Sequence, residues 1–334
     1  MVKLIAANDP LLTWKGVISL QRSKEFTMPW RIPYDKMDLF AWTLAEKAAM
    51  PAGVRIEFRT DSDWVELITT PEAERSAVDI FCDGIFKSTM PTINKDHIKF
   101  ADLGEYNKEI QIWLPQQGEF RLKGIEISDT SSISKSNINQ NPKWITYGSS
   151  ITQCRDADSP SLTWPSIVAR SNNLDLTCLG YGGECHLDPL VAKAIRDSDA
   201  DLISLCLGIN IYAYSSLNQR TFQPGIWAFI ELIREKHAEV PIIVMSPIYA
   251  SRDKAETTDN EVGFTLQKMR REIEESVEVL KRLGDKNIHY INGLDIFHER
   301  HKNLLHDGVH PDNRGYALMA ENISKLLKPH ISNL

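Results

Sequence analysis

The second half of the chain repeats one pattern, in which a short apolar run is followed by a loop and then by a helical pattern. The apolar runs lie at 144–147, 174–179, 202–207, 242–245 and 288–291. Buried strands that alternate with helices form parallel sheets that are covered on both faces. This repeat therefore predicts an α/β domain built on a parallel five-stranded sheet.

The helical patterns between these runs carry start and stop signals. Asp188 and Pro189 stand where a helix is expected to begin, as a capping residue and a first helical residue. Gly284 stands where a second helix is expected to end. That second helix is indicated by apolar residues three and four apart: Leu266, Met269, Ile273, Val277 and Leu280.

The first part of the chain alternates apolar and polar residues with period two. The segments VRIEFRT, IQIWLPQ and FRLKGIEIS all do so. Turn signals separate such segments, including Asp83-Gly84 between VDIFC and IFKST. Several short strands with turns between them predict a β-sandwich. The segment 40–50, FAWTLAEKAAM, is also compatible with a helix, and the pattern leaves it open.

A change in composition separates the two parts. Residues 128–142, SDTSSISKSNINQNP, are rich in Ser and Asn and almost free of large apolar side chains. Such a segment is typical of a linker or surface loop. We therefore expect a β-sandwich accessory domain at 1–140 and an α/β domain at 141–334.

Charge and cysteine content exclude several classes of protein. The net charge of −7 is mixed along the chain, which argues against a nucleic-acid surface or a basic membrane-binding face. No run approaches the roughly 20 apolar residues that span a bilayer, and the N-terminus lacks the pattern of a secretion signal. The five cysteines show no metal-site spacing, so free thiols and a cytoplasmic location are expected.

Polar residues that could carry out chemistry follow the predicted strands. Gly148-Ser149-Ser150 ends the first strand, Gly183 follows the second, and Asn210 follows the third. Asp307 and His310 lie three residues apart on a loop before the last helix. Ligands of open parallel sheets bind beyond the carboxyl ends of the strands. These residues are therefore expected to meet at one edge of the sheet.

Each residue type suits one part of an acyl transfer. A serine hydroxyl is a weak nucleophile that needs a neighbouring base, and His310 is the natural base. Asp307 could orient that histidine and stabilise its charged form. The Gly183 N–H and the Asn210 amide could donate to the oxyanion.

The same stretches resemble the SGNH (GDSL-type) hydrolases. GSSIT is similar to the family's first block and gives the nucleophile role to Ser150; YGGE gives Gly183, LGIN gives Asn210, and DGVHP gives Asp307 and His310. The resemblance implies a flavodoxin-like α/β/α fold, no metal or cofactor, and an oxyanion hole from Ser150 N–H, Gly183 and Asn210. Ser149 stands where the family usually has Asp, and branches with an N-terminal sandwich carry this GSSIT form.

Several neighbouring residues have competing interpretations. Ser149 is the alternative nucleophile, and Gly180 and Gly182 are expected to form turns with positive φ. Gly208 is expected to allow a close backbone approach. His186 and Tyr212 are candidate substrate-binding residues, although packing would explain them and Trp164 equally well. The histidines His298, His301 and His306 resemble a metal site in composition only, since their spacing fits no helical ligand pair.

These observations predict a cofactor-free serine esterase that removes a short acyl group, acetyl above all, from a carbohydrate or other small-molecule hydroxyl. An acyltransferase with the same catalytic residues is the alternative, because water and an alcohol compete for one acyl-serine. A carbohydrate-binding protein with an inactive hydrolase domain is the third reading, which the intact residue set disfavours. A long-chain lipase is disfavoured by the absence of an evident lid. The role of the sandwich and the oligomeric state stay open.

Overall fold

The computed structural model describes residues 2–137, 140–254 and 259–332. The chain divides into two compact units, Met1–Asn141 with Asp158–Ser161 and Pro142–Ala157 with Leu162–Leu334. The domain boundary expected from composition, between residues 140 and 141, remains a prediction about which parts fold on their own.

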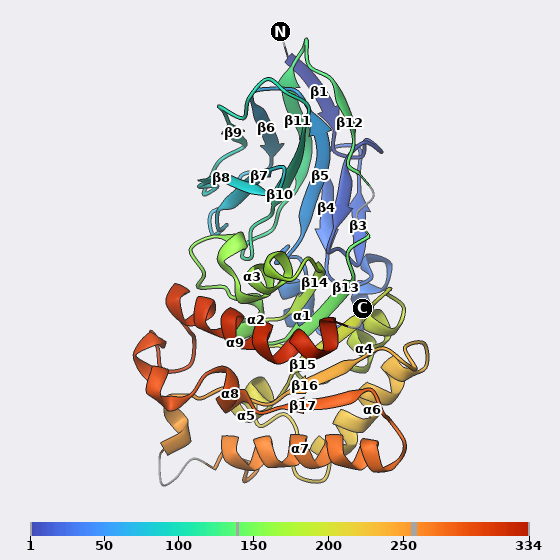
Figure 1. The fold of residues 1–334 in the computed structure, drawn as a ribbon, viewed down its shortest axis with the longest axis vertical. Helices are drawn as coiled ribbons and strands as arrows, with labels where there is room; N and C mark the ends of the chain where they lie inside the picture. Colours follow the sequence, from blue (N-terminus) through green and yellow to red (C-terminus); the bar gives the residue numbers. More distant parts are fainter. Residues whose placement is uncertain (1, 138–139, 255–258, 333–334) are drawn as a thin grey trace. The chain divides into compact units, whose positions relative to one another are not determined.

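The first unit consists of two antiparallel sheets (Figure 1). One sheet contains β1 (Val2–Ala6), β3 (Ser19–Arg22), β4 (Thr27–Trp30), β6 (Val65–Thr69), β9 (His97–Phe100) and β11 (Leu122–Ser128). The other contains β2 (Thr13–Lys15), β5 (Arg55–Thr60), β7 (Val78–Cys82), β8 (Ile85–Met90), β10 (Lys108–Trp113) and β12 (Ile133–Lys135). The strand orders are β3-β4-β11-β6-β9, with β1 beside β11, and β12-β5-β10-β7-β8, with β2 beside β5.

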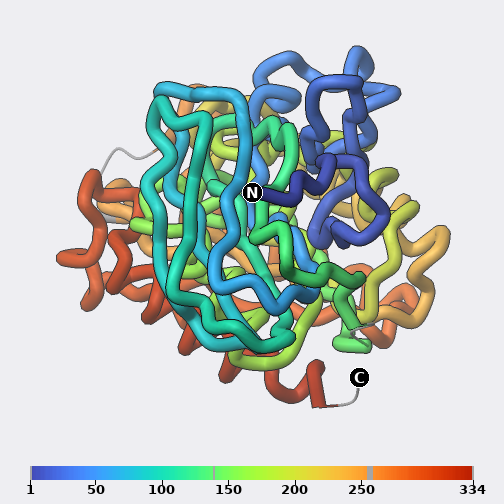
Figure 2. Tube along the Cα trace, turned by 90° about the horizontal axis from the view of Figure 1, so that it is seen from above, coloured from blue at the N-terminus to red at the C-terminus, as the bar shows by residue number. Residues whose placement is uncertain are grey.

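Period-two alternation produces the core of this sandwich. Ile56 and Phe58 of β5 and Ile110 and Ile112 of β10 are fully buried, and they join apolar residues of the other sheet, such as Ile125, in one cluster. Burial of each such side chain contributes on the order of 1.5–3 kcal/mol. The blue-to-green trace in Figure 2 shows the chain passing back and forth through these strands. The predicted β-sandwich is confirmed.

The turn between β7 and β8 follows from two residues. Asp83 and Gly84 both have positive φ, 48° and 76°. A two-residue hairpin turn of this kind matches the right-handed twist of the strands, and an Asp-Gly pair tolerates it well. The Asp83-Gly84 hairpin expected from the sequence is therefore present.

Two segments of the first unit go beyond the sequence-based expectations. The open segment 40–50 contains a helix, α1 (Trp42–Ala48), preceded by a 3₁₀ helix η1 (Tyr34–Leu39). The expected linker 128–142 is wrong in part, because β12 lies inside it and pairs antiparallel with β5. Ser134 thus lies opposite Arg59, so a polar segment adds an edge strand. Residues 138–139 of that linker lie outside the described part of the chain.

The second unit is built on a parallel sheet of five strands. The strands are β13 (Lys143–Gly148), β14 (Asp175–Gly180), β15 (Leu202–Cys206), β16 (Ile242–Met245) and β17 (Ile288–Ile291). Their order is β14-β13-β15-β16-β17, and each neighbouring pair is parallel. The chain therefore leaves β13 to one side and returns on the other, which creates a switch point at the ends of β13 and β15. The predicted five-stranded parallel sheet is confirmed.

Helices cover both faces of this sheet, and Figure 1 shows α9 and α7 on opposite sides of it. The helices are α2 (Ser150–Gln153), α3 (Trp164–Ser171), α4 (Pro189–Arg196), α5 (Ile209–Tyr214), α6 (Phe222–Arg234), α7 (Leu266–Arg282), α8 (Gly293–Ile296) and α9 (Asn313–Ile331). Short 3₁₀ helices lie at η2 (Pro160–Leu162), η3 (Ser251–Lys254) and η4 (Glu299–Leu304). The helix α3 packs on α9, and α6 packs on α4 and α7.

The helix signals of the sequence are confirmed with one exception. The predicted apolar stripe of α7 is buried, and Gly284 follows the helix with φ of 111°. Pro189 is the first residue of α4, but Asp188 makes no side-chain capping hydrogen bond there. Its carboxylate is largely buried instead, and burial raises the pKa of Asp188. The expectation that Asp188 caps the helix through its side chain is therefore wrong.

No helix in the described ranges is both long and apolar enough to cross a lipid bilayer. All five cysteines are free thiols, four of them buried and Cys206 partly buried.

Candidate active site

A tight turn places Ser150 at the carboxyl end of strand β13. Gly148 ends the strand, and a Cβ at that position would lie 2.1 Å from the Thr152 Oγ1, so only glycine allows the chain to turn here. Ser149 is the N-cap of α2, and its Oγ accepts a hydrogen bond from Ile151 N–H at 3.2 Å. Ser149 is thereby used for capping, and Ser150 begins the helix.

Ser150, His310 and Asp307 are joined by two short hydrogen bonds. The distance from Ser150 Oγ to His310 Nε2 is 2.7 Å, and that from His310 Nδ1 to Asp307 Oδ2 is 2.6 Å. An ionised carboxylate can only accept, so Nδ1 carries the ring proton and Nε2 is left to accept the serine proton. This is the arrangement in which a histidine can act as a general base on a serine.

The carboxylate of Asp307 is fixed by the loop that carries it. Its Oδ1 accepts from the backbone N–H groups of Val309 and His310 at 2.9 and 2.7 Å. Burial alone would raise the pKa of Asp307, but these bonds and that from the His310 side chain outweigh it and hold the pKa below its ordinary value. Asp307 is therefore held as an anion next to the imidazole near neutral pH.

A second loop supports this acid–base segment. Ser251 N–H donates to Gly308 O at 2.8 Å, and Gly308 has φ of 82°. Arg270 of α7 holds the Ser251 loop, because its guanidinium donates to Pro247 O at 2.8 Å and to both oxygens of Asp253 at 2.7 and 2.8 Å. No sequence pattern indicates this support, because Arg270 resembles an ordinary polar residue of an amphipathic helix.

The glycine segment after β14 is held by hydrogen bonds between its backbone and two side chains. Gly182 N–H donates to Gln153 Oε1 at 2.8 Å, and His186 Nε2 donates to Gly183 O at 2.8 Å. Gly183 itself has φ of 81°. These contacts hold the two peptides on either side of the Gly182–Gly183 peptide, whose N–H was predicted to face the oxyanion. Gln153 is a supporting residue that sequence analysis missed.

Two glycine expectations are wrong and one is confirmed. Gly180 and Gly182 do not have positive φ, unlike Gly183. A Cβ at Gly180 would instead lie 2.3 Å from Gln153 N, so this glycine lets β14 pack closely against α2. Gly208 does allow a close approach, since a Cβ there would lie 2.9 Å from Pro247 Cγ.

Asn210 lies near the start of α5, next to the glycine segment. Its Oδ1 accepts from Cys185 N–H at 3.1 Å, which fixes the orientation of the amide. The Nδ2 group is then the end that can donate to a developing negative charge. Asn210 is buried, so such a donation would be little weakened by solvent.

Replacement of Asn210 by alanine is expected to lower kcat by about 10²–10³, with a much smaller change in KM. The reason is that the lost donor acts on charge that develops only in the transition state. Steady-state rates on p-nitrophenyl acetate test this, with Asn172→Ala as the matched control because Asn172 makes its hydrogen bonds to Val168 O and Ser324 Oγ. Equal losses in both variants would contradict the assignment.

The residues predicted to bind substrate have contacts within the protein. His186 Nδ1 lies 2.8 Å from Ser216 Oγ, so both ring nitrogens have partners. Tyr212 is buried in α5, and burial raises the pKa of its hydroxyl. Trp164 is fully buried and donates to Ile151 O at 2.8 Å. A substrate-binding role of His186 and Tyr212 stays a prediction.

The histidines of the HERHKNLLH segment have separate local environments. His298 and His301 form a capping box at η4. His306 is exposed, and its Nε2 lies 3.8 Å from Asp307 Oδ2. Within the described ranges, no three His, Cys, Asp or Glu side chains are grouped as metal ligands.

The cysteines near the site are unsuited to nucleophilic attack. Cys154 and Cys185 are buried, and burial raises the pKa of both thiols. Burial also raises the pKa of Cys206 to about 12. Because the thiolate is the reactive form, Ser150 is the better placed nucleophile.

Several solved structures are similar to this protein over nearly the whole chain, including both units. The salicylyl-acyltransferase SsfX3 from a tetracycline biosynthetic pathway is 29% identical, with a TM-score of 0.91 over 98% of this chain and 97% of that one. A GDSL-like lipase candidate from Bacteroides ovatus is 21% identical, with a TM-score of 0.81 over 99% and 98%. A family two carbohydrate esterase from Clostridium thermocellum, in complex with cellohexaose, is 13% identical, with a TM-score of 0.72 over 97% and 100%.

Two families match the chain itself. Residues 12–123 match the family described as SsfX3, N-terminal domain. Residues 142–328, more than half of the chain, match the GDSL-like lipase/acylhydrolase family. No curated protein matches the chain. The second match includes Ser150, His310 and Asp307, which the two short hydrogen bonds join. The protein therefore belongs to the GDSL-like lipase/acylhydrolase family, as an SGNH hydrolase with an N-terminal β-sandwich.

Proposed function

We propose that this protein is a serine esterase that removes a short acyl group from a carbohydrate or other small-molecule hydroxyl. The observation that carries the proposal is the pair of hydrogen bonds linking Ser150 to His310 and His310 to Asp307. A serine that acts as a nucleophile needs a histidine of fixed tautomer and a carboxylate that orients this histidine, whereas few other roles of a serine require both.

The reaction proceeds through two steps. Ser150 Oγ attacks the ester carbonyl while His310 Nε2 takes the serine proton, and the alcohol leaves with that proton as the carbon–oxygen bond breaks. Water then attacks the acyl-serine, His310 takes a proton from it, and the carboxylic acid leaves as Ser150 regains its hydrogen. Asp307 keeps its negative charge throughout and stabilises the imidazolium.

The oxyanion of each tetrahedral intermediate is placed against three donors. These are Ser150 N–H, Gly183 N–H and Asn210 Nδ2. The hydrogen bonds from Gly182 N–H to Gln153 Oε1 and from Cys185 N–H to Asn210 Oδ1 hold the glycine segment and the Asn210 amide before substrate arrives. Donors that need no reorganisation stabilise developing charge most effectively.

The substrate class is supported by the similar structures. Carbohydrate esterases share the fold, and the one from Clostridium thermocellum was seen with cellohexaose. At 13% identity this likeness concerns the fold, so the carbohydrate alcohol is part of the proposal.

Acyl transfer to an alcohol is the second candidate function. It is favoured by the 29% identity to a salicylyl-acyltransferase over almost the full length of both chains. Both reactions share the acyl-serine and differ only in whether water or an alcohol attacks it. The catalytic residues alone therefore support both.

Product partition decides between the two functions. p-Nitrophenyl acetate would be incubated with enzyme alone and with excess glucose, methyl xyloside or glycerol, and nitrophenol, acetate and acetylated alcohol would be measured. An esterase releases equal amounts of nitrophenol and acetate in every mixture. A transferase gives acetylated alcohol and faster nitrophenol release. Nitrophenol release that does not depend on Ser150 would contradict both.

A further inference from the structure

Two largely buried ion pairs of the second unit have nearly the same geometry. Arg270 of α7 donates to both carboxylate oxygens of Asp253 at 2.7 and 2.8 Å. Arg234 of α6 donates to both oxygens of Asp285 at 2.8 and 3.0 Å. Each aspartate accepts one further hydrogen bond, at 3.0 Å, from a backbone N–H near it in the sequence. The exposed fractions of the four side chains lie between 8% and 15%, and pairs of this kind combine charge with fixed geometry.

The two pairs lie at opposite ends of the strand β16. Arg234 also donates to two backbone carbonyls that precede β16, at 2.8 and 2.6 Å, and Asp285 precedes β17. Arg270 donates instead to two carbonyls that follow β16, at 2.8 and 3.0 Å. Strands of a parallel sheet end on one side, and Ser150 follows β13 on that side. The Arg270 pair is therefore at the catalytic edge of the sheet, and the Arg234 pair is at the opposite edge.

A chain of hydrogen bonds leads from Asp253 to the catalytic acid. The turn that Asp253 closes contains Ser251, whose N–H donates to Gly308 O at 2.8 Å. The N–H of the same Gly308–Val309 peptide donates to Asp307 Oδ1 at 2.9 Å. This peptide is thus held by the Ser251 turn on one side and holds the Asp307 carboxylate on the other. A Cβ at Gly308 would lie 2.5 Å from Ser251 Oγ, so the two segments approach closely.

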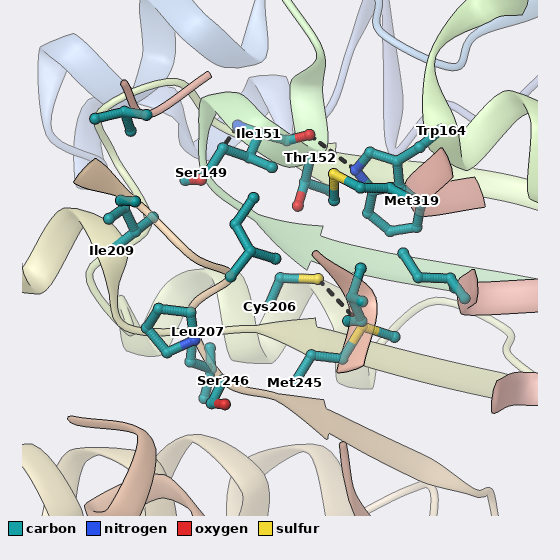
Figure 3. Close-up of a pocket in the computed structure, with 16 residues that line it drawn as sticks. Ser149, Ile151, Thr152, Trp164, Cys206, Leu207, Ile209, Met245, Ser246 and Met319 are labelled. Carbon is teal, nitrogen blue, oxygen red and sulfur yellow. Dashed lines mark hydrogen bonds between the residues drawn. The ribbon is translucent and has the colours of Figure 1, made fainter. Parts of the chain in front are cut away.

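Side chains join the same two segments. Pro247, Ile248 and Ala250, which follow β16, line a small apolar cavity together with Val309 (Figure 3). The volume of this cavity is about 30 Å³, which is room for about two waters. Because protein interiors are closely packed, displacement of the segment after β16 is expected to move Val309 as well. Arg270 is therefore linked to the acid–base segment, residues 307–310, through packing as well as through hydrogen bonds.

We propose that Arg270 and Asp253 form a positioning pair for the acid–base segment, whereas Arg234 and Asp285 contribute only to stability. This inference rests on the proposed function, and it adds two residues that act on the rate of the Ser150 reaction without contact with substrate. Misplacement of a reacting group by about 1 Å can lower a rate by about 10². Loss of the pair is therefore expected to lower kcat, whereas KM stays near that of the wild type.

Asp253→Asn and Asp285→Asn are matched variants that test the proposal in the full chain. Each keeps the shape of the side chain and leaves one buried guanidinium without its counter-charge, so both should lower Tm by similar amounts. Turnover of p-nitrophenyl acetate would be measured well below both Tm values. Asp253→Asn should lower kcat by about 10² with KM changed by less than about threefold, whereas Asp285→Asn should change kcat by less than about twofold.

Two milder changes test the same role if Asp253→Asn folds poorly. Arg270→Lys retains the positive charge but loses the fork, and it should lower kcat by about tenfold, whereas Arg234→Lys should leave kcat unchanged. Ser251→Pro removes the N–H that donates to Gly308 O, at the first position of a 3₁₀ helix, where proline is tolerated. It should also lower kcat by about tenfold. Its combination with Asp253→Asn should cost little more than Asp253→Asn alone, since both break one chain of contacts.

The outcomes separate failure of the positioning role from failure of the proposed function. Equal losses of kcat in Asp253→Asn and Asp285→Asn, or a lower Tm in both with kcat unchanged, would overturn the positioning role. A loss in Asp253→Asn that falls on KM rather than kcat would overturn it as well. In these cases the wild type still turns over ester through Ser150, and the function stands. A wild type without Ser150-dependent turnover of any ester would overturn the function and the positioning role with it.

Discussion

Ser150→Ala is expected to lower kcat on p-nitrophenyl acetate by about 10⁶. Without the hydroxyl, no acyl-enzyme forms, and only the oxyanion donors and substrate binding remain to accelerate attack by water. The fold should be unaffected, because the side-chain hydrogen bond that is lost joins Ser150 to His310 within the site. Initial rates at neutral pH, with Tm measured on the same samples, test this expectation.

Ser149→Ala is the comparison that distinguishes the two adjacent serines. Ser149 caps α2 by accepting from Ile151 N–H, so its loss should cost stability of about 1 kcal/mol. Formation of an acyl-serine should survive in this variant. If Ser149→Ala instead removed activity while Ser150→Ala retained it, the nucleophile would be Ser149 and the assignment of the whole site would change.

Asp307→Asn is expected to lower kcat by about 10⁴. Asparagine fills the same space, but its amide can donate to His310 Nδ1. That donation would favour the tautomer with the proton on Nε2, which cannot accept a proton from Ser150. The loss should fall on kcat rather than KM, because Asp307 acts through His310. A loss of less than tenfold, with an unchanged Tm, would show that His310 is oriented by other contacts.

The pH dependence of stability gives a second readout of Asp307. The folded state holds the pKa of Asp307 below its ordinary value. The ionised Asp307 carboxylate therefore stabilises the fold fully above the unfolded pKa of about 3.9. This stabilisation is lost as the pH falls through the folded pKa. The wild type should therefore exceed Asp307→Asn in unfolding free energy by a margin that is constant near neutral pH and shrinks in strong acid. Denaturant unfolding at several pH values measures this margin.

The five strands of the parallel sheet could be predicted because each is a short apolar run with a helix after it. The carboxyl edge of the sheet, where Ser150, Gly183 and Asn210 follow strands, could be predicted from the same pattern, since parallel strands end on one side. Asp307 and His310 lie on a loop before α9, and hydrogen bonds join them to Ser150. The helix α1 remained open because its helix-compatible segment stands among segments that alternate with period two. The strand β12 was missed because its sequence is polar and only its pairing with β5 makes it a strand.

The supporting contacts of the site could not be predicted, because they join residues far apart in the sequence. Gln153 holds Gly182, and Arg270 holds the loop whose Ser251 contacts Gly308. Gly180 was interpreted through its own φ, whereas the close approach of Gln153 requires glycine there. Asp188 was interpreted as a side-chain cap from its position alone, and its burial gives it a different environment.

In the proposed mechanism, Ser150 carries the acyl group between the ester and its acceptor. Mass spectrometry of the intact protein, quenched in acid within seconds of mixing with p-nitrophenyl acetate, tests it most directly, followed by peptide mapping of the modified residue. We predict one added acetyl group on Ser150 in the wild type and none in Ser150→Ala. In Asn210→Ala, the acetylated fraction should be larger if deacylation slows more than acylation. An acetyl group on another residue during turnover, or full turnover by Ser150→Ala, would show that Ser150 is not the nucleophile.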